Sequence, residues 1–520
     1  MSIKRSLLKS TGVISIATLA SRILGFARDM MIASFFGTGM SAQAFVVAFR
    51  LPNLLRDLVG EGATNAAVVP ILSEYRRKHS GADYWHLVSV IFNILMLILF
   101  VFVACGIFFS PAIIRLIAPG FVDTPQQFEL TVRLARRLFP YILLVGFSAY
   151  FMGVLNSLKN FAVSSWGQSL LNVSMLAAGF LLIPRFGVMG LVVGILVGGL
   201  LQVGIQIPVL LKKGMRLKIS AGFKHAAAVR MGRLLLPRIF GTAVYQINIF
   251  VDTMLASLAW VVGAGGVAAL YYSNRLIQFP LAIFALAMAQ AALPSMSYHV
   301  ADNDTDKLRE TVAFSLNSVF TVMLPASIGL AILGGPIIEM LFQRGEFTQY
   351  SVSITRSALF FYSFGLFAYS GIKILVTCFY SMRDTITPVK VAGFSVALNI
   401  ILNLILMWPL KIGGLALATS ISATVNFFIL FMLLSRRLKG LHEAHLLRSF
   451  AKILIATLIL GIFLSILKIF LGQLGDISFL FKVSFILGSI ILGIFVYFIA
   501  AFSLKIEAAR GAARWILKKK

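Results

Sequence analysis

Arginine side chains occupy two of the most apolar stretches of this chain. Residues 10–36 contain Arg22 and Arg28, and the next stretch contains Arg50 and Arg56. A guanidinium at the centre of a membrane helix costs about 2.5–3.5 kcal/mol on insertion scales, and ionisable residues at such depth are functional by default. Because arginine stays charged and its planar fork matches phosphate oxygens, the pattern indicates an anion held inside the membrane.

Acidic residues follow these arginines at a regular spacing. Asp29 lies seven residues after Arg22, Asp57 lies seven residues after Arg50, and Glu61 comes one turn later. Positions seven apart share one face of an α-helix, which predicts that each pair faces the same cavity about two turns apart. Internal ion pairing and snorkelling to a membrane interface are the structural alternatives to ligand binding. We expect the three acids and Arg50 to support the cavity.

Two helix-weakening residues lie among these charges. On a straight helix Arg28 points about 120° away from Arg22. Gly25 lies between them and permits a bend that would turn both arginines toward one ligand. Pro52 loosens the second stretch in the same way. Gly25 and Pro52 are therefore the predicted hinges.

Charges are sparser in the later apolar stretches. They include Asp252, Arg275 and Lys373, and over the whole chain the deep cations outnumber the deep acids. An unbalanced cationic cavity calls for an anionic partner. For Lys373 a packing role with hydrogen bonds to helix carbonyls stands beside a cavity role. For Asp252 a structural role stands beside a cation or proton site.

Composition shows which elements must position these residues. The chain has 520 residues, of which 59% are hydrophobic and 12% are charged. Soluble domains carry about 25% charged residues. Apolar runs of about 20 residues recur from end to end, which predicts an all-α polytopic membrane protein with about fourteen transmembrane helices.

The net charge of +28 does not indicate nucleic acid. Basic residues gather in alternate loops, such as Lys212–Lys218, Arg436–Lys439 and Lys518–Lys520, whereas loops such as 37–41 and 262–266 are nearly uncharged. This is the positive-inside pattern, and it places both termini in the cytoplasm. It excludes a nucleic-acid partner and suggests contacts with anionic membrane lipids.

Cysteine and histidine predict no metal site and no cofactor. Cys105 and Cys378 lie in apolar spans, and the six histidines fall in loops or at span ends. The spacing of His442 and His445 suits a solvated loop pair much better than zinc, because further ligands are missing.

An internal repeat with an offset near 224 residues divides the chain. Residues 69–73 match 293–297, residues 156–160 match 380–384, Gly190 matches Gly414, and Arg50 falls near Arg275. Each copy holds six spans, an even number, so the copies have the same orientation in the membrane. Parallel repeats are a transporter architecture with the substrate site between the lobes, although chance similarity among Leu- and Gly-rich helices is the alternative.

The repeat predicts three regions. Residues 1–220 form an N-terminal lobe of six helices, and residues 221–440 form a pseudo-symmetric C-terminal lobe of six more. Residues 441–520 add two helices and a basic cytoplasmic tail.

Several motifs resemble one family. The segment SRILGFARD at 21–29 and the segment RLPNLLR at 50–56 are similar to those of the MurJ/MviN family of lipid II flippases. The resemblance extends over nearly the whole chain. It includes residues 61–63, 118–121, 139–141, 272–280 and 379–388.

This resemblance implies the fold of the multidrug/oligosaccharidyl-lipid/polysaccharide exporter superfamily, with the last two helices forming a lipid-tail groove. It implies that lipid II, the undecaprenyl-diphosphate-linked peptidoglycan precursor, moves from the cytoplasmic to the periplasmic leaflet of a bacterial inner membrane. The substrate-binding set that it implies is Arg22, Arg28, Arg56 and Arg275, which would hold the diphosphate. The implied protein is a monomeric transporter and not an enzyme, with the cell-wall synthesis machinery as a possible partner.

The chain departs from the family pattern at acidic positions. Gln43, Asn274 and Gln278 stand where some relatives have acids, which makes the cavity still more cationic. Asp252 and Asp384 match part of a sodium site that some relatives have. Coupling to the membrane potential, Na⁺ or H⁺ is therefore open.

Three other functions remain as alternatives. A related exporter would carry another polyprenyl-linked oligosaccharide, whereas a drug antiporter would need an acidic cavity. A membrane enzyme acting on polyprenyl phosphates would need carboxylates to hold magnesium. The one dense acidic segment, 302–306, is best interpreted as a solvated loop.

Overall fold

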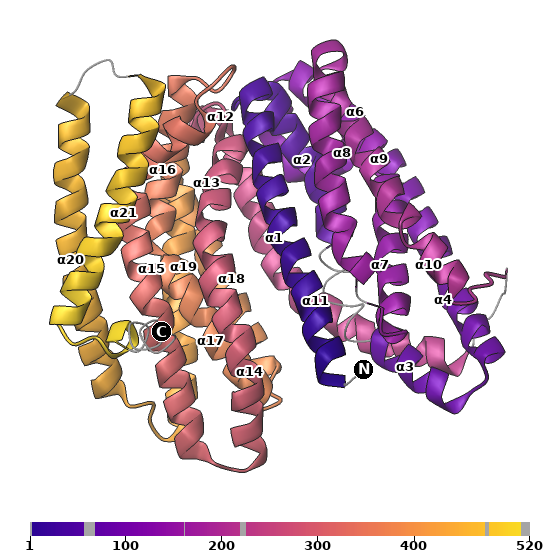
Figure 1. Ribbon diagram of the computed structural model, residues 1–520. Coiled ribbons are helices and arrows are strands. Elements are labelled where there is room, and N and C mark those ends of the chain that lie inside the picture. The colour runs from indigo at the N-terminus through magenta and orange to yellow at the C-terminus, as the bar shows by residue number, and fades with distance from the viewer. Residues whose placement is uncertain (1–2, 57–67, 161, 219–224, 474–477, 511–520) are drawn as a thin grey trace. The chain divides into compact units, whose positions relative to one another are not determined.

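The computed structural model describes residues 3–56, 68–160, 162–218, 225–473 and 478–510. Within these ranges every regular element is a helix, so the predicted all-α class is confirmed (Figure 1). The chain divides into two compact units, Met1–Leu258 and Ala259–Lys520.

In its described residues the first unit holds eleven α-helices and one 3₁₀ turn. Their bounds are α1 Ile3–Phe36, α2 Met40–Arg56, α3 Val69–Lys78, α4 Gly81–Phe108, α5 Ser110–Ile117, η2 Pro119–Phe121, α6 Pro125–Leu138, α7 Tyr141–Ser157, α8 Ala162–Phe186, α9 Met189–Gly204, α10 Ile207–Lys212 and α11 Ala226–Ala256.

The described part of the second unit contains ten α-helices and one π segment. Their bounds are α12 Ala259–Val262, α13 Gly266–Pro280, η3 Leu281–Ala285, α14 Leu286–Ala301, α15 Thr305–Phe342, α16 Gln349–Phe364, α17 Leu366–Ser381, α18 Ile386–Leu410, α19 Ile412–Leu438, α20 Glu443–Gln473 and α21 Phe479–Ser503.

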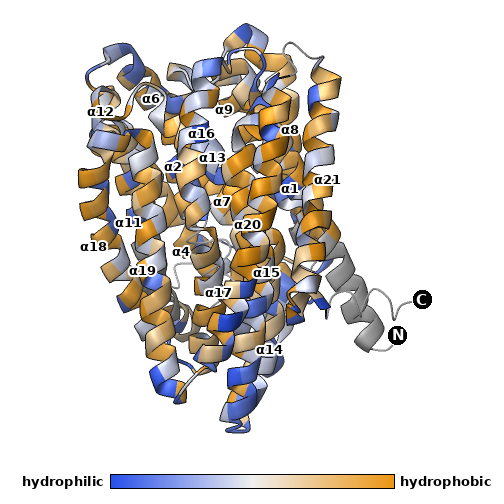
Figure 2. Ribbon diagram, turned by 90° about the vertical axis from the view of Figure 1, so that its left-hand side faces the viewer, coloured by the Kyte–Doolittle hydropathy of each residue, from blue (hydrophilic) through white to orange (hydrophobic). Residues whose placement is uncertain are grey.

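Long apolar helices account for most of the predicted spans. Among the described residues, ten helical stretches are long and apolar enough to cross a membrane, and the pair α16 and α17, bent by 47°, makes an eleventh. Helices α1, α2 and α11 match the three remaining predicted spans, which agrees with the expected fourteen. Figure 2 shows hydrophobic residues along the helices and hydrophilic residues at many of their ends, as near α14.

Helix α11 packs with the first unit, although the repeat assigns its residues to the second lobe. It contacts α4, α5 and η2. The Gly120 amide donates to the Ser257 hydroxyl at 3.1 Å just beyond the end of α11. The predicted boundary after residue 220 comes from the sequence repeat and not from the packing of α11. The three predicted regions therefore stay a prediction.

The two copies of the repeat end corresponding helices with the same backbone geometry. Lys159 after α7 has φ +60° and Arg383 after α17 has φ +61°. The next amides, of Asn160 and Asp384, donate to the carbonyls of Leu155 and Phe379, each at 2.9 Å. These are left-handed helix ends, in which an amide beyond the helix satisfies a carbonyl of its last turn.

A second pair of matching positions brings two helices together in each unit. A Cβ on Gly190 would lie 2.9 Å from Leu182 C and Ile183 N, and a Cβ on Gly414 would lie 2.1 Å from Leu406 O. Leu182 and Leu406 are themselves 224 residues apart. Only glycine permits such a close approach of α9 to α8 and of α19 to α18. These shared contacts are what a true repeat predicts, and chance similarity does not explain them.

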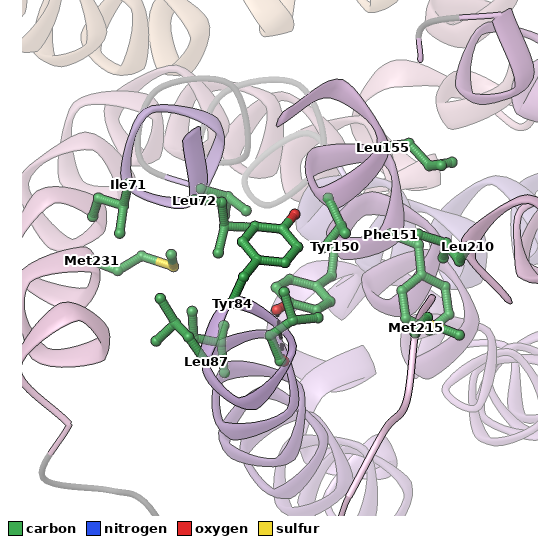
Figure 3. Close-up of a cluster of buried hydrophobic side chains, with 14 residues drawn as sticks. Ile71, Leu72, Tyr84, Leu87, Tyr150, Phe151, Leu155, Leu210, Met215 and Met231 are labelled. Atoms are coloured by element: carbon green, nitrogen blue, oxygen red, sulfur yellow. Dashed lines mark hydrogen bonds between the residues drawn. The ribbon is translucent and has the colours of Figure 1, made fainter. Parts of the chain in front are cut away.

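A cluster of buried apolar side chains stabilises one end of the first unit (Figure 3). It joins α3, α4, α7, α10 and α11. Its two buried tyrosines are hydrogen-bonded: the Tyr84 hydroxyl lies 2.8 Å from Ser157 Oγ, and the Tyr150 hydroxyl donates to the Val88 carbonyl at 2.8 Å. Because the buried hydroxyls are satisfied, the cluster holds these helices without an unpaired polar group.

Candidate functional site

Arg28 lies buried on α1 in a network of polar contacts. Arg28 is only 5% exposed, and Asp29 is 1% exposed. Arg28 Nε and Nη2 donate to Asp29 Oδ1 at 3.1 and 2.8 Å. Since two donors of the planar guanidinium meet one carboxylate, the arginine is oriented as well as charge-compensated.

Asn172 on α8 completes this network. Its Oδ1 accepts from Arg28 Nη1 at 2.9 Å, and its Nδ2 donates to the Ser21 carbonyl at 2.9 Å. Ser169, one turn earlier on α8, donates to the Ala17 carbonyl at 3.3 Å. The two polar side chains therefore attach α8 to successive turns of α1. Spacing and charge patterns do not point to Asn172, because its only signal is a single amide in an apolar helix.

Gly25 has a packing role in this structure. Helix α1 runs unbroken from Ile3 to Phe36, and a Cβ on Gly25 would lie 3.4 Å from Asn172 Nδ2. The glycine thus leaves room for the amide that contacts Arg28. Bending at Gly25 stays a prediction, and so does bending at Pro52, which lies inside α2.

Arg22 and Asp29 differ in their surroundings, although helical phase predicts a shared face. Arg22 is exposed, whereas Asp29 is buried and paired with its neighbour Arg28. Arg28 and Asp29 start from different faces of α1, but the Arg28 side chain is long enough to reach the Asp29 carboxylate. The seven-residue spacing therefore missed the ion pair that forms.

Arg50 attaches α2 to α11. Its Nη1 donates to the Ile249 carbonyl at 3.0 Å. The predicted partner Asp57 and the neighbouring acid Glu61 lie outside the described residues. Arg56 is half-buried at the end of α2, and Gln43 is buried near its start. A long-range bond to a main-chain carbonyl is a structural contact that sequence spacing does not reveal.

Tyr141 joins the candidate site from the first turn of α7. Its side chain is fully buried and its ring lies 6.2 Å from that of Phe49 on α2. Its hydroxyl has no hydrogen-bond partner among the described residues. Arg28 and Arg56 both act on that hydroxyl electrostatically. An unsatisfied buried hydroxyl that feels the charge of two arginines is uncommon.

Arg275 is the predicted ligand-binding residue of the second unit. It lies half-buried on α13, with its guanidinium carbon 5.0 Å from the centre of the Tyr271 ring and its Nη2 donating to the Tyr271 hydroxyl at 3.1 Å. Asn274 and Gln278 on the same helix are exposed, and Lys373 on α17 is exposed as well. The ring and the hydroxyl of Tyr271 therefore both help to orient Arg275.

The two aspartates of the possible cation site have different partners. Asp252 is buried on α11, and Asn248 donates to it at 3.3 Å. Asp384 lies before α18, where it accepts from the Thr387 amide at 3.0 Å and from Arg437 at 2.5 Å. The Thr387 amide and, to a smaller extent, the Thr387 hydroxyl and Arg437 lower the pKa of Asp384. Asp384 thus caps α18, which is a structural role.

Within the described ranges, no group of three or more His, Cys, Asp or Glu residues is arranged to hold a metal ion. Of the histidine pair, His445 contacts Glu507 at 3.4 Å between exposed side chains.

The fold has counterparts among solved transporters. A structure titled "Lipid II flippase MurJ, inward closed conformation" matches 94% of this chain and 97% of its own, with 27% sequence identity and a TM-score of 0.78. An inward-facing multidrug resistance MATE family transporter of the MOP superfamily matches 81% of this chain and 96% of its own, with 17% identity and a TM-score of 0.68. Together, the fold and the arginines inside the helices define the class: a multi-span membrane transporter with the fold of the MOP superfamily.

Sequence comparison specifies the family. The family model described as "Lipid II flippase MurJ" matches residues 32–485. A Vibrio cholerae protein named "Probable lipid II flippase MurJ" is 36% identical over 85% of this chain and 84% of its own length. A Burkholderia cenocepacia "Lipid II flippase MurJ" is 32% identical over 89% of each chain. The chain belongs to the MurJ family of lipid II flippases.

Proposed function

We propose that this chain moves lipid II from the cytoplasmic to the periplasmic leaflet of a bacterial inner membrane by alternating access. Both termini lie in the cytoplasm, as the basic loops predict. The cargo is anionic through its diphosphate, and the deep charges of the chain are mainly cationic. Membership of the MurJ family supports the cargo.

The observation that carries the proposal is the buried Arg28 guanidinium in its preformed setting. Asp29 and Asn172 hold it in one orientation before any ligand arrives. Preorganised hydrogen-bond donors inside a low-dielectric site act more strongly on an anion than the same donors in water. We place Arg28 at the diphosphate for this reason.

The other arginines have complementary roles. Arg22 is exposed on α1, six residues before Arg28, and would make the first contact with the diphosphate. Arg56 adds charge from α2, with the Tyr141 hydroxyl as a further donor. Arg275 contributes from the second unit, with its orientation set by Tyr271. Arg50 bonds a carbonyl of α11 and has a structural role.

The energy source is part of the same proposal. A membrane potential that is negative inside is worth about 2.3 kcal/mol per charge per 100 mV, which is enough to reset a cationic cavity. Sodium or proton coupling is the other route. Of the two candidate aspartates, Asp252 is the stronger, because the oxygens of Asp384 already accept from Thr387 and Arg437. The transporter works as a monomer, alongside the enzymes of cell-wall synthesis.

Depletion of the protein in its source bacterium tests the proposal. Lipid II that reaches the periplasmic leaflet is measured with an impermeant reagent, while the wild-type chain, Arg28→Ala or Arg275→Ala is supplied at equal membrane levels. The wild type should restore export and both variants should not. Normal export by either variant would overturn the assigned role of that arginine, and unchanged export after depletion would overturn the function.

A further inference from the structure

Helix α6 in the first unit carries three arginines on one exposed face. Arg133, Arg136 and Arg137 are all exposed, and together with Glu129 they span an arc of about 100° around the helix. The opposite side of α6, which includes Leu138, is buried, and α6 packs on α2. We call the three exposed arginines the α6 arginine face.

The contacts of this face place it at the level where membrane helices end. Helix α6 lies beside α9 (Figure 1) and also contacts α4. Arg136 Nε donates to the Ile107 carbonyl at 3.3 Å, just before the end of α4. Arg137 Nη1 donates to Met189 Sδ at 3.1 Å, at the first residue of α9. Since α4 and α9 both belong to stretches that can cross a membrane, these two arginines lie at the height of the lipid headgroups.

The α6 arginine face carries surplus positive charge. Arg133 pairs with Glu129, one turn earlier, at 2.6 Å, whereas the carbonyl and the sulfur that accept from Arg136 and Arg137 are uncharged. Three arginines against one carboxylate leave a net charge of +2. With both termini in the cytoplasm this end faces the periplasm, where the positive-inside pattern disfavours cations. The surplus therefore calls for a compensating anion.

The type of cation indicates which anion fits. Residues 109–140 and 180–190, which form the connections at this end, contain five arginines and no lysine. The planar guanidinium binds two oxygens of one phosphate, whereas an ammonium acts as a point charge. The composition therefore favours recognition of a phosphate group.

Apolar surfaces flank the α6 arginine face on both sides. Beside Arg136, Phe108 and Phe109 are exposed at the end of α4. Beside Arg137, Phe186 is exposed at the end of α8, three residues before Met189. A diacyl phospholipid has one phosphate and two hydrocarbon chains and can cover both flanks, whereas a single prenyl chain covers one.

We propose that the α6 arginine face binds the phosphate of an anionic diacyl phospholipid, whose two chains lie against the apolar residues on either side. Arg136 and Arg137 contact the phosphate, and Arg133, held by Glu129, borders it. The site rests on these contacts and charges. Only its assignment to the periplasmic leaflet rests on the topology of the proposed function.

Photolabelling of the full-length protein in phosphatidylcholine nanodiscs tests the site. The probe is phosphatidylglycerol with a diazirine near the start of one acyl chain, and labelled peptides are mapped by mass spectrometry. We expect labelling of residues 101–117 and 181–197. Arg136→Gln combined with Arg137→Gln should lower this labelling about 25-fold, or about fivefold for each charge removed. Labelling of the double variant within twofold of wild type would overturn the proposal.

A variant with increased binding excludes misfolding as the cause. Glu129→Gln raises the surplus charge from +2 to +3 and should raise labelling about fivefold at subsaturating probe. A damaged fold does not produce such a gain. Unchanged or weaker labelling of this variant would contradict a site governed by the surplus charge.

Matched controls separate this site from general charge effects. Arg76→Gln with Arg77→Gln removes two exposed arginines from the end of α3 and should leave labelling of the same peptides unchanged. An equal fall in this control would overturn the site. Arg136→Lys with Arg137→Lys keeps the charge but loses the planar fork, so labelling should fall, although by less than in the glutamine pair. Wild-type labelling of the lysine pair would overturn the guanidinium–phosphate contact.

Competition tests the choice of a diacyl phospholipid. Unlabelled phosphatidylglycerol should displace the probe at a lower mole fraction than undecaprenyl phosphate does. The reverse order would overturn the assignment to a phospholipid, and failure of phosphatidylglycerol to displace the probe would overturn the site. Labelling does not require export, so this result is separate from the leaflet measurement that tests the proposed function.

Discussion

Arg28 and Arg275, one in each unit, are held by different chemistry. Arg28 is 5% exposed and rests on a carboxylate and an amide. Arg275 is half-buried and rests on the ring and hydroxyl of Tyr271. A carboxylate compensates the charge of a buried cation, whereas an aromatic ring attracts a cation through the electrons of its face. The more deeply buried arginine, Arg28, is therefore paired with a carboxylate, and the less buried Arg275 is packed on an aromatic ring.

The largest expected effect comes from Arg28→Ala. The substitution removes one partner of a buried ion pair, which costs about 3–5 kcal/mol of stability, and it also removes the proposed diphosphate ligand. Thermal unfolding of the purified protein measures the first loss, and lipid II leaflet accessibility measures the second.

A double variant separates the two losses. Arg28→Met with Asp29→Leu replaces the pair by apolar side chains of similar size, so stability should return close to that of wild type. Export should stay absent. If the double variant exports lipid II, the ion pair is structural and Arg28 does not bind the cargo.

Removal of the amide that supports Arg28 should have the next largest effect. Asn172→Ala loses the bonds to Arg28 and to the Ser21 carbonyl and should cost about 1–3 kcal/mol of stability, with slower export. Ser169→Ala is the matched control on the same helix, since it loses a bond to α1 that does not involve Arg28. Equal slowing of export by both variants would show that only helix packing matters.

Substitutions of Tyr271 test the aromatic support in the second unit. Tyr271→Leu removes both the ring and the hydroxyl that orient Arg275. The lost interaction energy is about 0.5–2 kcal/mol and should be measured as a lower export rate. Tyr271→Phe keeps the ring and should lower the rate by less. Equal loss of export rate in both variants would mean that the hydroxyl, rather than the ring, positions Arg275.

Asp384 and Arg437 form an exposed counterpart to the buried Arg28 pair and should show the smallest effect. The Thr387 amide lowers the pKa of Asp384 below its ordinary value of 3.8. Its stabilising contribution is therefore present above pH 4 and is lost as the pH falls through the lowered pKa. Asp384→Asn should cost less than about 1 kcal/mol at pH 7, because exposed ion pairs contribute little.

Unfolding measured from pH 7 downward checks this sign. The difference between wild type and Asp384→Asn should stay constant to about pH 4 and shrink below it. A difference that grows on acidification would contradict the capping role.

Periodicity and spacing predicted much of the fold. Runs of apolar residues located the spans, and glycines such as Gly190 and Gly414 revealed the repeat, because backbones that touch exclude a Cβ at the same place in each copy. The repeat does not predict the neighbours of α11. Its residues follow the repeat in sequence but pack on α4 and α5, and no periodic pattern records which neighbour a helix has.

The sequence by itself determined the kind of molecule and led to the hypothesis of an anionic ligand. Charges that persist inside apolar helices require a partner of opposite sign, so arginines imply an anion without any coordinates. Only the tertiary structure decided how each arginine is supported. Asn172 lies 144 residues from Arg28, and Ile249 lies 199 residues from Arg50. Hydrogen bonds depend on distance and direction in space, and one amide or carbonyl among many in apolar helices has no sequence signature until the helices pack.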